Sequence, residues 1–250
     1  MRDVAATALA YLPSASTSGQ PASHTGAQPI SDTVLAAWAA AQHSPSSPVI
    51  SNAVVDAAAR LRENVVFRRA ARLDAPAGGF VVAYTHNAVS PGLGTVGVLL
   101  AVQPRGGISA LHGTPERAVL VAAARRIAMH IAAARPAYLT RSHVPNSVLE
   151  RERAVHAHGA SASGKPANIV ARMVDGRLAK WAAETVLCEQ PFVLGDDGQR
   201  VDATLDAAAK QAGFKAGAIV HSFVHFVVGE AVASETNNAS SSNSETRATA

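Results

Sequence analysis

An α+β fold is predicted by the order of patterns along this 250-residue chain, in which short apolar runs come first and longer helical patterns follow. The runs at 64–73, 79–86 and 96–102 are rich in β-branched residues and are separated by Pro and Gly clusters. From residue 115 onwards, apolar residues instead recur every three or four positions over long stretches. This succession predicts a small antiparallel sheet packed with helices.

The elements before residue 103 begin with a helix. Val54, Val55, Ala58 and Leu61 stand at helical spacing and predict a helix at 52–62. The three apolar runs that follow are each the length of a strand, and turn-forming residues connect them. We therefore interpret them as a three-stranded antiparallel meander.

Three helices are predicted next, each with a recognisable boundary. The first is amphipathic, covers 115–135 and ends before Pro136, because a residue that precedes proline disfavours the helical conformation. The second begins at Pro145, since proline fits the first helical position, and it runs until Gly159. The third begins near Pro166. Its one expected weak point is a glycine in its interior.

The last elements are a short helix at 205–212 and a strand at 218–228. Residues 13–30 are rich in Ser and Pro and predict a disordered loop, and 234–250 predict a disordered tail, because neither segment has enough apolar bulk to offset the entropy of ordering. Residues 4–30 also lack acidic side chains, as transit peptides do, but they lack the usual arginines. The N-terminal segment can therefore be interpreted either as a disordered loop or as part of a transit peptide, and both interpretations stay open.

The composition excludes several classes of protein. Twenty-two Lys and Arg against 18 Asp and Glu give a net charge of +4, which permits nucleic-acid binding without indicating it. The single cysteine, Cys188, excludes an intrachain disulfide and a Cys-based zinc site. The longest apolar run, 96–102, is too short for a membrane span. We therefore expect a soluble protein.

A glycine motif suggests one enzymatic alternative. Gly92, Gly94 and Gly97 fit the G-x-G-x-x-G spacing of dinucleotide-binding loops. That fingerprint must open a helix, whereas the segment after it reaches only the length of a strand before Pro104. We interpret Gly92–Gly97 as a turn that opens a strand, and a nucleotide-binding enzyme that uses this loop is kept only as an alternative.

The histidines and the cysteine do not form a catalytic pattern. His221 and His225 stand four apart, as in HExxH zinc sites, but Ser222 takes the place of the catalytic Glu. On a strand, the two imidazoles would lie about 13 Å apart, too far to share a metal. Cys188 has no nearby base and is interpreted as a small apolar filler. Composition and spacing therefore predict a non-catalytic domain that needs no metal or cofactor.

Longer blocks of sequence carry a family resemblance. In chain order they read ENVVFRRAARL, TVGVLLAV, RRIAMHIAAARPAYL, SGKPANIVARMVDGRLAKWAAETVLCEQPFV and SFVHFVVGEAV. Together they resemble successive blocks of translation elongation factor Ts (EF-Ts).

The resemblance implies a guanine-nucleotide exchange factor that promotes GDP release from the GTPase EF-Tu during protein synthesis. Such a factor acts by protein–protein contact, is not an enzyme, has no cofactor, and binds GDP-bound and nucleotide-free EF-Tu without nucleic acid or membrane. The implied fold is the core of the EF-Ts dimerisation domain, with two small subdomains that each pack an antiparallel sheet with helices. We expect these at 1–106 and 107–233, in a mitochondrion or another organelle with bacterial-type translation.

Three EF-Tu-binding residues follow from the resemblance. Val96 and Gly97 match a hydrophobic–glycine pair that presses on the GTPase domain, and His130 matches an interface histidine. The residues by themselves leave alternatives open. Gly97 permits close backbone approach or marks a β-bulge. His130, expected to point partly sideways between Ile127 and Ile131, is more simply a satisfied structural histidine.

The sequence also departs from the family. It contains no Thr-Asp-Phe-Val motif, whose Asp and Phe act as a wedge near the magnesium site of EF-Tu in family members. We therefore expect Met1 to be an internal start that leaves the first subdomain truncated and a targeting peptide missing. His225 and Val227 stand where the family usually has Arg and often has Glu. A relic that binds EF-Tu without promoting exchange remains an alternative.

Overall fold

The computed structural model describes residues 28–29, 50–66, 70–90, 92–106, 115–161, 166–195 and 198–230. Its helices are α3 (Ile50–Leu61), α4 (Pro115–Ala134), α5 (Asn146–Ser161), α6 (Ala167–Thr185) and α7 (Val201–Gln211), with 3-10 turns η1 (Arg141–His143) and η2 (Leu187–Glu189). Its strands are β1 (Gln28–Pro29), β2 (Ala71–Arg72), β3 (Phe80–His86), β4 (Val96–Pro104) and β5 (Ala218–Val227). The predicted α+β class is confirmed.

The main sheet has three antiparallel strands in the order β3-β4-β5. At its centre, Leu100 of β4 pairs with Val82 of β3 and with Phe223 of β5, and the register shifts by a bulge between Ala101 and Val102. Within the described residues, β1 and β2 form a separate two-stranded ladder.

The predicted meander is therefore wrong in one strand. Only Ala71–Arg72 of the run at 64–73 forms a described strand, and it pairs with β1 inside the predicted Ser/Pro-rich loop. The third strand of the main sheet is β5, from the far end of the chain. The physical reason is its apolar content, because β5 supplies Val220 and Phe223 to the core, whereas the run at 64–73 carries three arginines.

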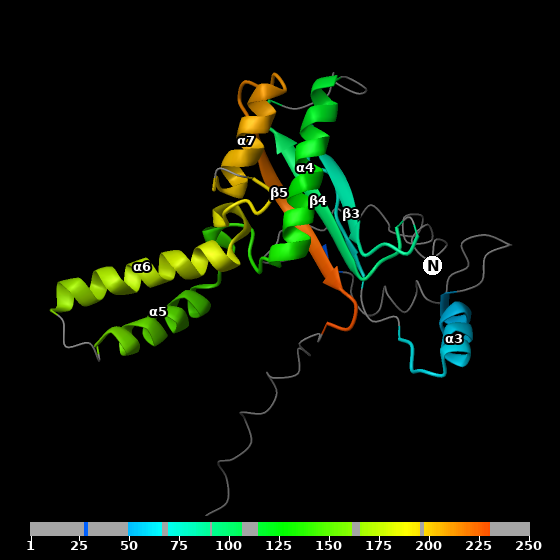
Figure 1. The fold of residues 1–250 in the computed structure, drawn as a ribbon, viewed down its shortest axis with the longest axis horizontal. Coiled ribbons are helices and arrows are strands. Elements are labelled where there is room, and N and C mark those ends of the chain that lie inside the picture. Colours follow the sequence, from blue (N-terminus) through cyan, green and yellow to red (C-terminus); the bar gives the residue numbers. More distant parts are fainter. Residues whose placement is uncertain are drawn as a thin grey trace, which may run out of the picture.

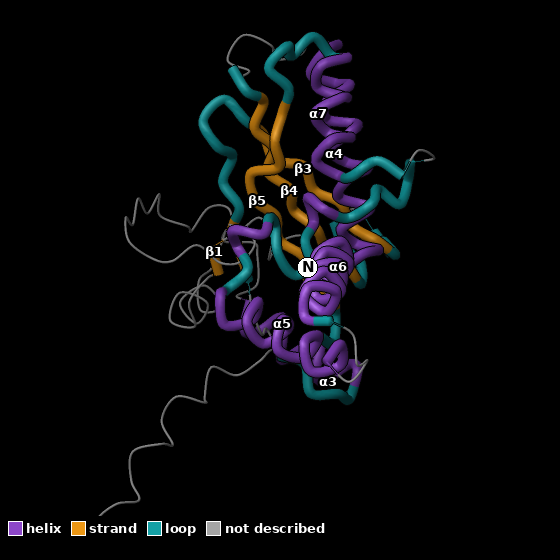
Figure 2. Tube along the Cα trace, turned by 90° about the vertical axis from the view of Figure 1, so that its left-hand side faces the viewer, coloured by secondary structure: helices purple, strands orange, loops and turns teal. Residues whose placement is uncertain are grey.

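Helices α4 and α7 cover one face of the main sheet (Figure 1). Figure 2, turned by 90°, places the strands on one side of these two helices. Fully buried Leu120, Ile127 and Ile131 line the inner face of α4, with alanines between them that let the helix approach the strands closely. Leu205 of α7 is buried in the same core. The amphipathic helix predicted at 115–135 is thus confirmed.

Helices α5 and α6 form a hairpin that extends away from the sheet (Figure 1). The hairpin has a small core of its own, built on Val144, Ala182 and Val186 with Trp181 packed against them. Gly176 does not interrupt α6. None of the described helices is long and apolar enough to span a membrane.

The boundary expected between the two subdomains, at residues 106 and 107, separates strands that belong to one sheet. β3 and β4 precede it and β5 follows it, so strands from both expected subdomains share the main sheet. The division between 106 and 107 stays a prediction. The tail at 234–250, and the loop at 13–30 apart from β1, lie outside the described residues.

Candidate partner-binding site

Gly97 lies on the open face of the sheet, at the end where β3 and β5 finish and β4 begins. We call residues 84–90, 92–97 and 226–228 the sheet tip. Gly97 pairs with Thr85 on one side and with Phe226 on the other. A Cβ added to Gly97 would meet no atom within 4 Å, so space is open in front of the strand. The bulge lies at Ala101/Val102, which excludes the alternative of a bulge at Gly97.

Val96 precedes Gly97 in β4 and points to the opposite face. Val96 is only 6% exposed and its side chain belongs to the main core, so it holds β4 on the face that the helices cover. The tip also carries exposed apolar side chains, because Val89 is 81% exposed and Val228 is 74% exposed. The backbone N–H of Val228 donates to the carbonyl of Thr95, which holds this end of β5 against β4. The tip therefore combines an open glycine backbone with apolar side chains.

His130 has a different environment, inside the molecule. It is 1% exposed, and its ring packs against Phe192 with ring centroids 5.8 Å apart. The backbone N–H of Val193 lies 3.3 Å from Nδ1, and Gln190 Oε1 lies 2.8 Å from Nε2. Because a backbone N–H can only donate, Nδ1 accepts, and Nε2 carries the proton that it donates to Gln190. His130 is thus a neutral imidazole with both nitrogens satisfied.

Burial also keeps that imidazole uncharged. Desolvation lowers the pKa of His130 below its usual value, and this effect is larger than the opposing one of the hydrogen bond to Gln190. The partners of His130 are Gln190, Phe192 and Val193, all of which follow α6, so the flank of α4 that carries His130 is covered and not open to solvent. The segment that follows α6 lies over this side of α4 and removes the side chain from water. Its geometry is that of a satisfied structural histidine.

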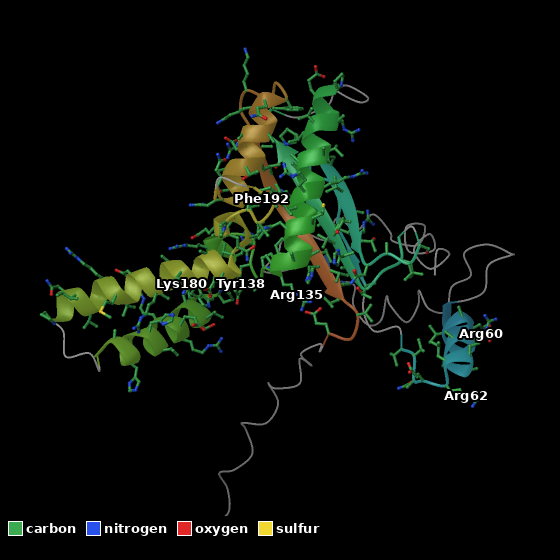
Figure 3. The ribbon with its side chains drawn as sticks, in the orientation of Figure 1. Arg60, Arg62, Arg135, Tyr138, Lys180 and Phe192 are labelled. Atoms are coloured by element: carbon green, nitrogen blue, oxygen red, sulfur yellow. The ribbon has the colours of Figure 1, made fainter. Side chains whose placement is uncertain are left out.

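The exposed residues beside His130 were not predicted from the sequence. Phe192–Gly195, which we call the 192–195 loop, exposes Val193 by 62% and Leu194 by 40%. Arg126 of α4 donates to the carbonyl of Leu194, and its guanidinium lies 5.3 Å from the centre of the Phe192 ring. Figure 3 labels Phe192, which lies where α4, α6 and α7 come together. The sequence did offer a signal for these exposed residues, the run Phe-Val-Leu directly before a glycine. Three consecutive apolar residues in a short loop cannot all face the core, so at least one of them had to be exposed.

The structure does not bring the three predicted residues into one cluster. Gly97 lies on the open face of the sheet, whereas His130 belongs to the helix that covers the other face. The two regions therefore offer separate surfaces, the sheet tip and the 192–195 loop.

The remaining candidates carry no catalytic arrangement in the described part of the chain. Residues 92–95 form a turn and a strand follows at Val96, so Gly92–Gly97 does not open a helix. Burial raises the pKa of the Cys188 thiol to about 12, which keeps it protonated. His221 lies at the bulge of β5 and is exposed. Among the described residues, no three His, Cys, Asp or Glu side chains lie close enough to hold a metal ion.

Comparison with known proteins gives a consistent result. The family model described as Elongation factor TS matches residues 24–230. Elongation factor Ts of Bartonella bacilliformis is 40% identical over 190 residues, which cover 76% of this chain and 58% of the relative. The corresponding protein of Mesorhizobium japonicum is 38% identical over 199 residues, or 80% of this chain and 61% of the relative.

Elongation factor Ts of Brucella ovis is 39% identical over 186 residues, which cover 74% of this chain and 57% of the relative. The chain thus spans about three fifths of the length of the bacterial relatives that it matches. The family model covers well over half of the chain, from before α3 to the end of β5. On this sequence match and the α+β core that accompanies it, the chain belongs to the elongation factor Ts family.

Proposed function

We propose that this chain binds EF-Tu and promotes the release of GDP from it during protein synthesis. The observation that carries the proposal is the family match over residues 24–230, a range that includes Val96, Gly97 and His130. The partner in this proposal is EF-Tu in its GDP-bound and nucleotide-free states. The factor acts by protein contact alone, not as an enzyme, and uses neither a cofactor nor nucleic acid nor a membrane.

The two exposed surfaces divide the binding between them in this proposal. At the sheet tip, Gly97 lets a segment of EF-Tu approach the backbone of β4, while Val96 holds the strand in place from the core side. At the second surface, Val193 and Leu194 make the apolar contact. His130 acts there by holding the 192–195 loop, because its Nδ1 accepts the hydrogen bond from the Val193 backbone.

Exchange places an energetic requirement on these surfaces. A factor that accelerates GDP release must bind nucleotide-free EF-Tu more tightly than GDP-bound EF-Tu, so that factor and nucleotide weaken each other reciprocally. Contacts made equally to both states add affinity but shift no equilibrium. The Thr-Asp-Phe-Val wedge is absent from this sequence. For these 250 residues taken alone, the second candidate function is therefore binding to EF-Tu with little exchange activity.

One experiment tests both functions. The 250-residue chain is mixed with EF-Tu loaded with a fluorescent GDP analogue, and stopped-flow records the release of the analogue at saturating factor. We expect the chain to co-elute with EF-Tu and to accelerate release less than a version extended upstream by a Thr-Asp-Phe-Val segment. No co-elution at about 100 μM, where even a weak interface is populated, would overturn the proposal. Equal acceleration by both versions would show that the described core carries the exchange activity.

We also propose that the protein works beside a bacterial-type translation system, in a mitochondrion or a comparable organelle. The similarity to bacterial relatives and the acid-poor composition of residues 4–30 support this proposal. Fluorescent tagging of the protein expressed from its complete gene tests it, and exclusive signal outside organelles would contradict it.

A further inference from the structure

Gln190 is a buried polar residue at the meeting point of several elements. It directly follows η2, and only 3% of its surface is exposed. A polar side chain in this position costs free energy unless its hydrogen bonds are made. Both ends of the Gln190 amide make one.

The side chain of Gln190 joins α4 to α6. Its Oε1 accepts a hydrogen bond from the N–H of His130 Nε2 at 2.8 Å, and its Nε2 donates to the carbonyl oxygen of Glu184 at 2.7 Å. The Glu184 carbonyl can only accept, so the amide has one permitted orientation. The hydrogen bonds thereby set how the C-terminal turn of α6 lies against α4.

The backbone of Gln190 adds two further connections. Its carbonyl accepts from the N–H of Val201, the first residue of α7, at 3.0 Å. Its N–H lies 3.1 Å from the carbonyl of Val186, next to the buried core of the α5–α6 hairpin. The residue therefore links α4, α6 and α7 immediately before the exposed 192–195 loop.

The conformation of the 192–195 loop depends on the hydrogen bonds around Gln190. Two residues beyond Gln190, the Phe192 ring packs on His130, and the Val193 N–H donates to the same imidazole. If Gln190 releases His130, the ring can turn, and Val193 loses the acceptor that holds its backbone. The exposure of Val193 and Leu194 thus depends on an amide that cannot touch a partner itself.

We propose that Gln190 is a positioning residue for partner binding, which presents Val193 and Leu194 of the 192–195 loop in the conformation that EF-Tu recognises. The inference rests on the proposed function. Gln190 acts through the chain Gln190–His130–Val193 and makes no contact with EF-Tu. This role differs from stabilising the fold, because it predicts that the effect of Gln190 on affinity passes through the two loop residues.

A double-mutant cycle measures that dependence. Gln190→Met removes both side-chain hydrogen bonds at nearly the same length, and the background variant carries Val193→Ser and Leu194→Ser. Affinity for EF-Tu is measured by titration at a temperature at which circular dichroism shows every variant to be folded. We expect Gln190→Met to weaken binding about tenfold in the natural background and to have almost no further effect in the serine background. Gln211→Met, at an exposed position on α7, is the matched control and should leave affinity unchanged.

Other outcomes identify which statement fails. Absence of binding by the unaltered chain contradicts the proposed function itself. Binding with an equal loss from Gln190→Met in both backgrounds, or with no loss in either, overturns only the positioning role. Gln190→Asn serves as a second variant, since it keeps the amide but is too short to reach both partners. If both variants fail to fold at any temperature, Gln190 is structural and the inference is wrong.

Discussion

The sheet tip and the 192–195 loop are two apolar surfaces built in opposite ways. At the tip, Gly97, the residue that matches the family, is itself exposed. A Cβ added to it would have no other atom within 4 Å. At the loop, the matched residue, His130, is buried, and its neighbours Val193 and Leu194 are exposed. In the proposed binding mode, a residue that the family resemblance assigns to partner binding therefore need not itself lie on the exposed surface.

Because of this difference, substitutions in the two regions should affect stability and partner binding to different extents. A Cβ placed on Gly97 meets no atom within 4 Å, and the residue lies on the open face of the sheet, so a substitution there should alter the surface and leave the core as it is. A substitution of His130 removes two hydrogen bonds and a ring contact inside the molecule, so it should alter stability and surface together.

The largest effect is expected for His130→Ala, which tests the buried side of the comparison. The change leaves the buried Gln190 Oε1 without its partner, which costs about 1–3 kcal/mol, and it also removes the acceptor of the part-buried Val193 N–H and the ring contact with Phe192. We expect a loss of about 3 kcal/mol in the free energy of unfolding, measured by denaturant titration. Met129→Ala, at the neighbouring and partly exposed position on α4, is the control and should lose much less. Equal losses in both variants would mean that the His130 hydrogen bonds contribute little.

Gly97→Leu tests the exposed side and should show the reverse pattern. We expect a loss of about 2 kcal/mol in binding to EF-Tu, because the new side chain occupies the space that the partner backbone approaches, with a change in stability of about 0.5 kcal/mol or less. Ala216→Leu adds a leucine at an exposed position at the other end of the sheet and should leave affinity unchanged. A large fall in melting temperature with unaltered affinity would show that Gly97 is only structural.

A smaller effect is expected for Val193→Ser combined with Leu194→Ser. Because both side chains are already exposed, stability should change little, while the loss of apolar contact should weaken EF-Tu binding about tenfold. Titration calorimetry at matched concentrations measures the change. Unaltered affinity would remove the 192–195 loop from the interface and leave the sheet tip as the binding surface.

The smallest effect is a dependence on pH that belongs to the loop region alone. The pKa of His130 in the folded chain lies below its ordinary value of 6.5, so the unfolded chain takes up a proton at higher pH than the folded chain. The free energy of unfolding should therefore fall as the pH drops below 6.5 and level off once the pH is below the folded pKa. His130→Ala should lose this part of the pH dependence and Gly97→Leu should keep it. Identical profiles for both variants would contradict the assignment to His130.

Local patterns predicted most elements correctly. The spacing of Leu120, Ile127 and Ile131 predicted α4, and the β-branched runs predicted β3 and β4. The short helix predicted at 205–212 instead begins at Val201. The N–H of Val201 donates to the carbonyl of Gln190, which lies eleven residues earlier in the chain. Patterns of this kind depend on residues close in sequence, which is why they can be read without the structure.

The sequence by itself thus determined the α+β class, the helices, the strand that contains Gly97 and, through its blocks, the family. Only the tertiary structure decided that β5, rather than the run at 64–73, completes the sheet, and that His130 lies under the 192–195 loop. The physical reason is the same for both. Periodicity reports which side of an element is apolar, but the segment that covers that side comes from a distant part of the chain, and its identity depends on packing and hydrogen bonds that form only in the folded protein.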